Sequence, residues 1–176
     1  MSELGVHDVP VTVVTGFLGT GKTTAILDAF RHRAPGEQWA VLVNEFGEVG
    51  LDGLVMDAGG LAVREVPGGC ICCSANVIFE HTLVQVLRTR PDRLLIEPSG
   101  LATLSGVLDT LARKGIREAV DVRSVVVVMD PTRLEDALSR EDVRNQVDCA
   151  DILIANNADR ATAQQLAGFD TWARGL

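Results

Sequence analysis

The sequence predicts an α/β fold in three layers, with a mostly parallel sheet and helices on both faces. Short runs rich in valine, isoleucine and leucine alternate with longer segments of helical period, the pattern of βαβ units. The run Val125–Met129 is wholly apolar, which is typical of a strand buried on both faces. The chain has 176 residues, 47% hydrophobic and 23% charged, a size and composition that suit one such domain.

The elements follow in order from these patterns. Pro10 and Gly16 bound a strand over Val11–Thr15, and a helix over Thr23–Arg33 ends before Pro35. β-rich runs predict strands at Trp39–Asn44 and at Leu61–Val66, the second of which is stopped by Pro67 and two glycines. Apolar residues at helical spacing then predict a helix over Asn76–Arg88.

The second half repeats the alternation. It predicts strands at Arg93–Ile96, Ser124–Met129 and Ile152–Ala155, and helices at Leu101–Arg113, Glu141–Cys149 and Ala161–Gly168. In a parallel sheet, ligands bind at the carboxyl ends of the strands. Each chemically interesting loop follows a predicted strand, with first residues Gly16, Glu45, Cys70, Glu97, Asp130 and Asn156.

The segment Gly16–Thr23 matches the pattern G-x-x-x-x-G-K-[ST] between a strand and a helix. Glycines let successive backbone N–H groups face one point, which together with the helix N-terminus makes an anion site. Lys22 is expected to reach the β- and γ-phosphates, and the Thr23 hydroxyl to bind Mg²⁺. The predicted nucleotide-binding residues here are Gly16, Gly19, Thr20, Gly21, Lys22, Thr23 and Thr24.

The tetrad Asn156-Asn157-Ala158-Asp159 follows the last predicted strand and suggests a guanine reader. The Asp159 carboxylate can accept two hydrogen bonds from the N1–H and N2–H₂ edge of guanine, which adenine does not offer. The predicted base-binding residues are therefore Asn156 and Asp159. An ordinary turn or helix cap is the alternative interpretation.

Glu97 follows a predicted buried strand, where P-loop proteins place an acidic group that holds Mg²⁺ through water. Gly100 is placed so that its N–H can meet the γ-phosphate, and Lys22, Glu97 and Gly100 are the predicted catalytic residues. A plain Pro-Gly turn is the alternative. The segment Asn44–Gly50 is interpreted as a switch that responds to the γ-phosphate.

Cys70, Cys72 and Cys73 offer three thiolates in one loop, and soft thiolates suit Zn²⁺, Cu(I) and Co²⁺. The tight spacing and three local ligands predict an exchangeable site with an open position, which Glu45, Glu48 or His81 would complete. A redox switch between nearby thiols is the alternative. Cys149, in a predicted helix, is interpreted as a small core hydrophobe.

Four segments in this order resemble the CobW family of P-loop GTPases: Gly16–Thr23, Asn44–Glu48, Gly69–Cys73 and Glu97–Ala102. The resemblance implies a GTP-hydrolysing metallochaperone that binds GTP or GDP and zinc or cobalt and delivers the metal to a client metalloprotein; it is compatible with a homodimer. Asn157 stands where the family usually has lysine. Residues 1–176 would form a P-loop GTPase domain without the family's last strand and C-terminal domain.

Two further interpretations stay open, a nucleotide-gated metal sensor with negligible turnover and a P-loop ATPase or small-molecule kinase. The net charge is −8 with scattered basic residues, which argues against a nucleic-acid partner. The N-terminus has no basic region of a secretory signal, and no apolar run is long enough to span a bilayer. A cytoplasmic protein without a membrane partner is expected.

Overall fold

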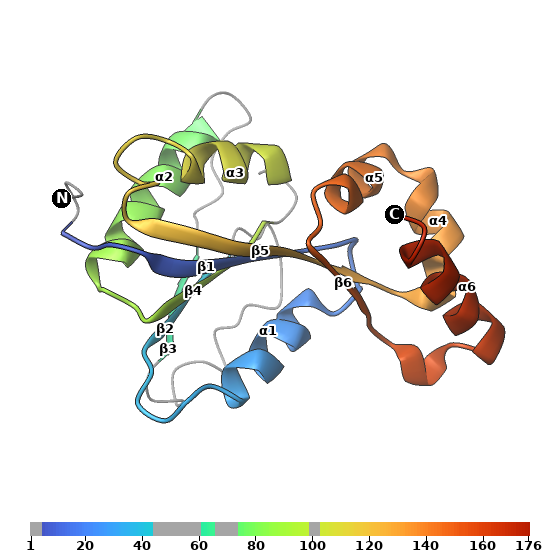
Figure 1. The fold of residues 1–176 in the computed structure, drawn as a ribbon. Coiled ribbons are helices and arrows are strands. Elements are labelled where there is room, and N and C mark those ends of the chain that lie inside the picture. Colours follow the sequence, from blue (N-terminus) through green and yellow to red (C-terminus); the bar gives the residue numbers. More distant parts are fainter. Residues whose placement is uncertain (1–4, 44–60, 66–73, 99–102) are drawn as a thin grey trace.

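The computed structural model describes residues 5–43, 61–65, 74–98 and 103–176. Their strands form one six-stranded sheet in the order β3-β2-β4-β1-β5-β6, and every pairing is parallel (Figure 1). The strands are β1 (Val9–Thr15), β2 (Trp39–Val43), β3 (Leu61–Glu65), β4 (Arg93–Glu97), β5 (Val120–Met129) and β6 (Ile152–Ala155). The predicted α/β class and the parallel sheet are confirmed.

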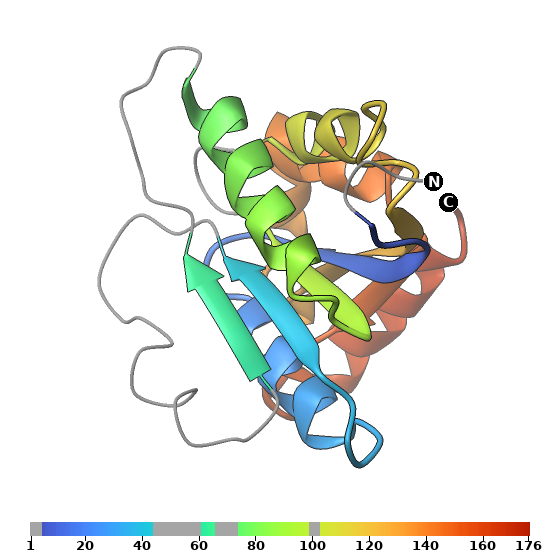
Figure 2. The same ribbon diagram turned by 90° about the vertical axis from the view of Figure 1, so that its left-hand side faces the viewer.

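Helices cover both faces of this sheet, as Figures 1 and 2 show. They are α1 (Lys22–Arg31), α2 (Ser74–Arg88), α3 (Leu104–Leu111), α4 (Leu134–Ser139), α5 (Glu141–Asp148) and α6 (Ala163–Ala173). Two short 3₁₀ turns, η2 (Pro131–Arg133) and η3 (Ala158–Arg160), follow β5 and β6. The connections therefore place a loop at the carboxyl end of each of these strands.

Strands β1, β2 and β4 are buried on both sides because their side chains alternate between two cores. One core joins Val13, Leu42 and Ile96 to apolar residues of α2 through α6. The other joins Val14, Val41 and Val128 to Ile26 and Phe30 of α1. Strand β2 is buried at every position, which explains its continuous apolar sequence.

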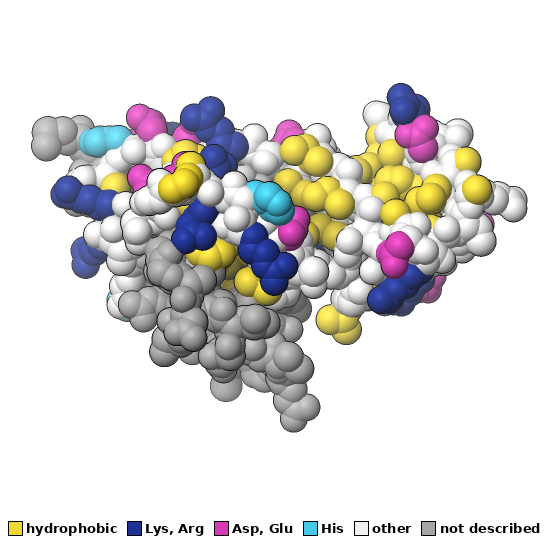
Figure 3. Space-filling view, turned by 90° about the horizontal axis from the view of Figure 1, so that it is seen from below, with side chains coloured by type: hydrophobic (Ala, Val, Ile, Leu, Met, Phe, Trp, Pro, Cys, Tyr) yellow, Lys and Arg dark blue, Asp and Glu magenta, His cyan; other side chains and the backbone are white. Residues whose placement is uncertain are grey.

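The α1 side of β6 is less covered than the same side of β1, β2 and β4. Ile152 and Ile154 are 48% and 37% exposed, whereas Leu153 between them packs into the larger core. Figure 3, seen from the α1 side, shows hydrophobic side chains gathered near the middle of this face. Among the described helices, α1 alone contributes to the core on this side of the sheet.

Four elements, β5, η2, α4 and α6, differ most from the sequence predictions. β5 begins at Val120, earlier than predicted, because its first half pairs with β1 while carrying polar and exposed residues that hide the strand pattern. The turn η2 and helix α4 occupy a stretch with no predicted element, where the Asp130 carboxylate caps the turn by accepting from the Thr132 N–H. α6 continues past Gly168, since Phe169 is buried and its ring meets that of Trp172 at 5.6 Å.

The prediction that Cys149 is a core residue is wrong, because the residue is exposed at the C-cap of α5. The buried positions of that helix are Val143 and Val147, one turn apart. Two residues beyond Val147 the helix has turned by about 200°, which points position 149 away from the core. None of the described helices has the length and hydropathy that a bilayer crossing requires.

Candidate nucleotide-binding site

The phosphate loop links β1 to α1, as predicted, and its three glycines, Gly16, Gly19 and Gly21, have a positive φ that favours glycine. Gly16 has φ +143°, and a Cβ placed there would lie 2.2 Å from the carbonyl oxygen of Val128. Gly21, the N-cap of α1, is left-handed with φ +87°. The Thr20 hydroxyl, buried in the loop, donates to the Phe17 carbonyl at 2.8 Å. The loop is thus closed on itself directly before the N-terminus of α1.

Three predicted residues meet where this loop enters the helix. The Thr23 hydroxyl donates to the Glu97 carboxylate, with Oγ1 at 3.1 Å from Oε2. The Lys22 ammonium lies 3.8 Å from Glu97 Oε1 and 3.4 Å from the Phe17 carbonyl oxygen. Glu97 is the last residue of β4 and only 5% exposed. The pairing of β4 with β1 therefore brings a buried carboxylate to the first turn of α1.

Asn156 joins the loop after β6 to the phosphate loop. Its side-chain N–H₂ donates to the Thr20 carbonyl at 2.7 Å, and its own N–H donates to the Met129 carbonyl at 2.8 Å. A Cβ at Gly21 would lie 2.3 Å from the Asn156 amide nitrogen, so the helix N-cap must be glycine for this approach. The predicted base-binding and phosphate-binding loops are thus connected by one side chain.

Asp130, directly after β5, holds Asn157, which follows Asn156 in the loop after β6. Its carboxylate accepts from the Asn157 amide at 2.9 Å, while Asn157 is left-handed with φ +56°. Burial raises the pKa of Asp130, but hydrogen bonds from Thr132 and Asn157 and the charge of Arg133 outweigh burial, so the pKa lies below its ordinary value of 3.8. A charged Asp130 therefore holds the residue that stands where the family usually has lysine.

The remaining predicted residues are either exposed or outside the described part of the chain. Gly19 and Thr24 are exposed at the loop and on α1, and Asp159 is exposed in η3. His81 is exposed on α2, and the described residues contain no cluster of three His, Cys, Asp or Glu side chains suited to a metal. Outside the described residues lie the predicted Gly100, the switch segment and the predicted transition-metal ligands Glu45, Glu48, Cys70, Cys72 and Cys73.

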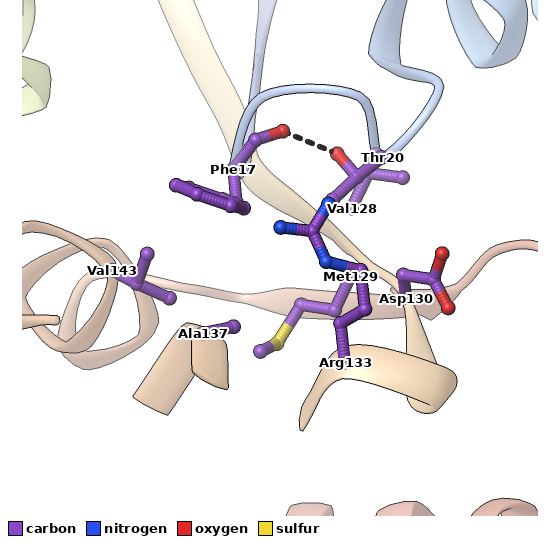
Figure 4. A pocket seen from close by; sticks show the side chains of 8 residues that line it. All are labelled: Phe17, Thr20, Val128, Met129, Asp130, Arg133, Ala137 and Val143. Atoms are coloured by element: carbon purple, nitrogen blue, oxygen red, sulfur yellow. Dashed lines mark hydrogen bonds between the residues drawn. The ribbon is translucent and has the colours of Figure 1, made fainter. Parts of the chain in front are cut away.

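Phe17, inside the phosphate loop, contacts two arginines that the sequence analysis did not single out. The Arg133 guanidinium carbon lies 5.1 Å from the ring centroid, and that of Arg140 lies 4.7 Å from it. Figure 4 shows Arg133 rising from η2 toward the loop, beside a small cavity that also contacts Met129 and Val143. That cavity measures about 10 Å³, room for one water at most, so it is not a ligand site.

A larger cleft, also lined by Phe17, has a volume of about 500 Å³. It is lined by the phosphate-loop residues Gly16 and Lys22, by Pro98 after β4, and by Arg140 at the start of α5. Its size is in the range of small-ligand sites. Pattern reasoning missed Arg140 because no local motif marks it; only the packing of α5 against the sheet brings it there.

A strand, a glycine-rich loop and a helix, with a buried acidic residue at the end of the neighbouring strand, define a P-loop nucleoside-triphosphate-binding domain. The chain belongs to the CobW/HypB/UreG family of nucleotide-binding domains, whose family model matches residues 10–176. This confirms the resemblance found in the sequence.

Two curated relatives and one solved structure illustrate the family. The zinc chaperone YeiR of Escherichia coli (strain K12) is 44% identical over 163 residues, covering 91% of this chain and 50% of that protein. The zinc chaperone CobW of a Sinorhizobium species is 33% identical, covering 90% and 53%. The crystal structure of Zn(II)-bound YjiA GTPase from E. coli has a TM-score of 0.66 and 23% identity, covering 96% and 55%, and shares the fold. The chain thus spans about half the length of these proteins.

Proposed function

We propose that this chain is a GTP-binding and GTP-hydrolysing domain that couples the state of its nucleotide to the handling of zinc. The observation that carries the proposal is the convergence of Lys22, Thr23 and Glu97 at the entrance of α1, with Asn156 linking that loop to the predicted base-binding loop. The relatives named zinc chaperones support the metal as cargo.

In this proposal the phosphate loop binds the triphosphate through backbone N–H groups at the N-terminus of α1. Lys22 changes its partner, from Glu97 and the Phe17 carbonyl to the β- and γ-phosphate oxygens. Glu97 stays buried at the end of β4, where its charge balances the loop. The role of these residues is to position the phosphates and stabilise charge as the γ-phosphate bond breaks, and hydrolysis needs no covalent step with the protein.

The donor set fits Mg²⁺. The Thr23 hydroxyl oxygen and the Glu97 carboxylate oxygen are hard ligands that already lie 3.1 Å apart in the structure. Thr23 would hold the ion directly and Glu97 through water, and the bound ion would neutralise charge on the phosphates. A soft metal such as zinc would instead prefer the thiolates of Cys70, Cys72 and Cys73.

Zinc is proposed as cargo at the three-cysteine loop, with Glu45 or Glu48 of the switch segment as a ligand that responds to the γ-phosphate. The binding of GTP would order the switch and complete the metal site, and hydrolysis would relax it. Delivery to a client metalloprotein follows from the same proposal. Cobalt, which also accepts thiolate ligands, is the alternative cargo.

The Asp159→Asn variant tests the choice of base. It replaces an acceptor of two hydrogen bonds with a group that offers one acceptor and one N–H₂ donor, which suits the N1–H and 2-oxo edge of xanthine and mismatches guanine. We expect the GTP affinity to fall about 100-fold and the affinity for xanthosine triphosphate to rise, measured by competition against a fluorescent GDP.

The same assay includes ATP as competitor and the exposed, neighbouring Arg160→Ala as the control variant. Wild-type protein and the control should prefer GTP over ATP by at least about 100-fold. Equal competition by ATP and GTP, or unchanged GTP affinity in Asp159→Asn, would refute guanine recognition. The rate of phosphate release, measured with and without zinc, then distinguishes an enzyme that hydrolyses GTP from a module that only binds it.

A further inference from the structure

The cleft beside the phosphate loop contains a second cation besides Lys22. Arg140 stands at the junction of α4 and α5 and lines the cleft together with Gly16, Lys22 and Pro98. A nucleotide whose phosphates bind the loop would leave its terminal phosphate at the wall that β4 and the loop share. Arg140, the N-cap residue of α5, lines the same cleft.

The guanidinium of Arg140 is held in two ways. Its Nε and Nη2 donate to the two carboxylate oxygens of Asp142 at 3.2 and 3.4 Å, and its carbon lies 4.7 Å from the Phe17 ring centroid. The Asp142 pair is half exposed, at 48% and 57% of the two side chains, so water screens it and its contribution is small. The aromatic contact orients the cation over the phosphate loop, and the carboxylate occupies the fork of N–H groups that a phosphate would use.

One acceptor in the cleft has no donor. The amide oxygen of Gln146, six residues or nearly two helical turns beyond Arg140, is buried and accepts no hydrogen bond from the described residues. Burying an acceptor without a donor is unfavourable. A ligand that brings ordered water into the cleft, as a hydrated magnesium triphosphate does, would supply the donor.

We propose that Arg140 binds the terminal phosphate of the bound triphosphate, exchanging the carboxylate of Asp142 for phosphate oxygens while it stays stacked on Phe17. The proposal rests on the proposed function, since it assumes that the phosphate loop binds a guanine nucleotide. A guanidinium matches phosphate with two parallel N–H donors, and a terminal phosphate carries more charge than one carboxylate. Arg140 would then distinguish GTP from GDP, because only GTP extends a third phosphate toward it.

Arg133 provides a matched control. It stacks on the same Phe17 ring, at 5.1 Å, but it contacts the small cavity and is absent from the lining of the cleft. Replacing Arg133 with alanine removes one cation from the ring without removing one from the cleft. Loss of stacking and loss of phosphate contact can therefore be separated.

The experiment measures the dissociation constants of GDP and of a non-hydrolysable GTP analogue for the wild type and for Arg140→Ala, Arg140→Lys, Arg133→Ala and Asp142→Asn. We expect Arg140→Ala to weaken analogue binding about tenfold or more with GDP binding within twofold, and Arg140→Lys to be intermediate. Asp142→Asn should strengthen analogue binding by removing the competing carboxylate, and Arg133→Ala should keep the wild-type ratio. Thermal melting checks that each variant is folded.

Two results would overturn the inference alone: an unchanged ratio of the two constants in Arg140→Ala, or an equal change in Arg133→Ala, which would assign the effect to stacking. Wild-type protein that binds neither nucleotide would overturn the proposed function and this inference with it. The experiment therefore separates a failure of the role of Arg140 from a failure of nucleotide binding itself.

Discussion

Replacement of Lys22 by methionine is expected to lower the affinity for GTP and GDP by at least about 100-fold, measured by titration of a fluorescent nucleotide. Methionine keeps the volume of the stem and removes only the ammonium. Each charge-assisted hydrogen bond to a phosphate contributes about 1.5–3 kcal/mol, so losing the contacts to two phosphates accounts for the change.

The same substitution should also destabilise the nucleotide-free protein. Both side chains of the Lys22–Glu97 pair are nearly buried, at 11% and 6% exposed. Removing one charge from a buried pair costs about 3 kcal/mol or more of unfolding free energy, because the other charge stays in a poorly solvating environment.

The double variant Lys22→Met/Glu97→Gln separates these two effects. Glutamine is neutral, and its oxygen still accepts from the Thr23 hydroxyl, so the variant should recover most of the stability and none of the nucleotide affinity. Wild-type affinity in either variant would contradict the assignment of Lys22 to the phosphates.

Replacement of Gly16 by alanine should have the second large effect, on stability as well as on binding. The new methyl would lie 2.2 Å from the Val128 carbonyl oxygen, a backbone atom of the neighbouring strand, at a φ of +143°. To relieve this steric clash, β1 and β5 would have to separate at their carboxyl ends. We expect a loss of about 3 kcal/mol or more of unfolding free energy and a melting temperature lower by about 6–12 °C.

Gly19→Ala is the matched control for steric conflict. Its φ of +79° is also left-handed, but a Cβ there meets no atom within 4 Å. Only the conformational strain applies, so the expected loss is about 1 kcal/mol. Equal destabilisation of both variants in thermal and urea unfolding would contradict the close approach of Gly16 to β5.

The sequence predicted those parts of the fold and site whose cause is local. The phosphate loop was predicted because its glycines, Lys22 and Thr23 lie within one short segment of the sequence. Glu97 was predicted as its neighbour because a parallel sheet brings the carboxyl ends of its strands to one edge. Strand β2 was predicted because both of its faces are apolar. A few adjacent residues determine the phosphate loop and β2, whereas the place of Glu97 follows from the general geometry of a parallel sheet.

The missed features depend on contacts distant in sequence. The roles of Asp130 and Asn157 follow from a hydrogen bond across two strand ends, and Arg140 reaches the cleft only because α5 packs above β5 and β6. α6 passes through Gly168 because Phe169 and Trp172 pack together, against the helix propensity of glycine. Cys149 is apolar, but its helical phase relative to the buried Val143 and Val147 places it on the exposed side of α5.

The most direct test of zinc handling under nucleotide control is a zinc titration of the reduced protein in nucleotide-free, GDP-bound and GTP-analogue-bound forms. A competing chromophoric chelator reports the free metal, and a variant with serine at Cys70, Cys72 and Cys73 is the control. We predict one zinc site, lost in the serine variant, whose affinity differs at least about fivefold between the GDP and GTP-analogue forms. Equal zinc affinity in all three forms, or undiminished affinity in the serine variant, would contradict it.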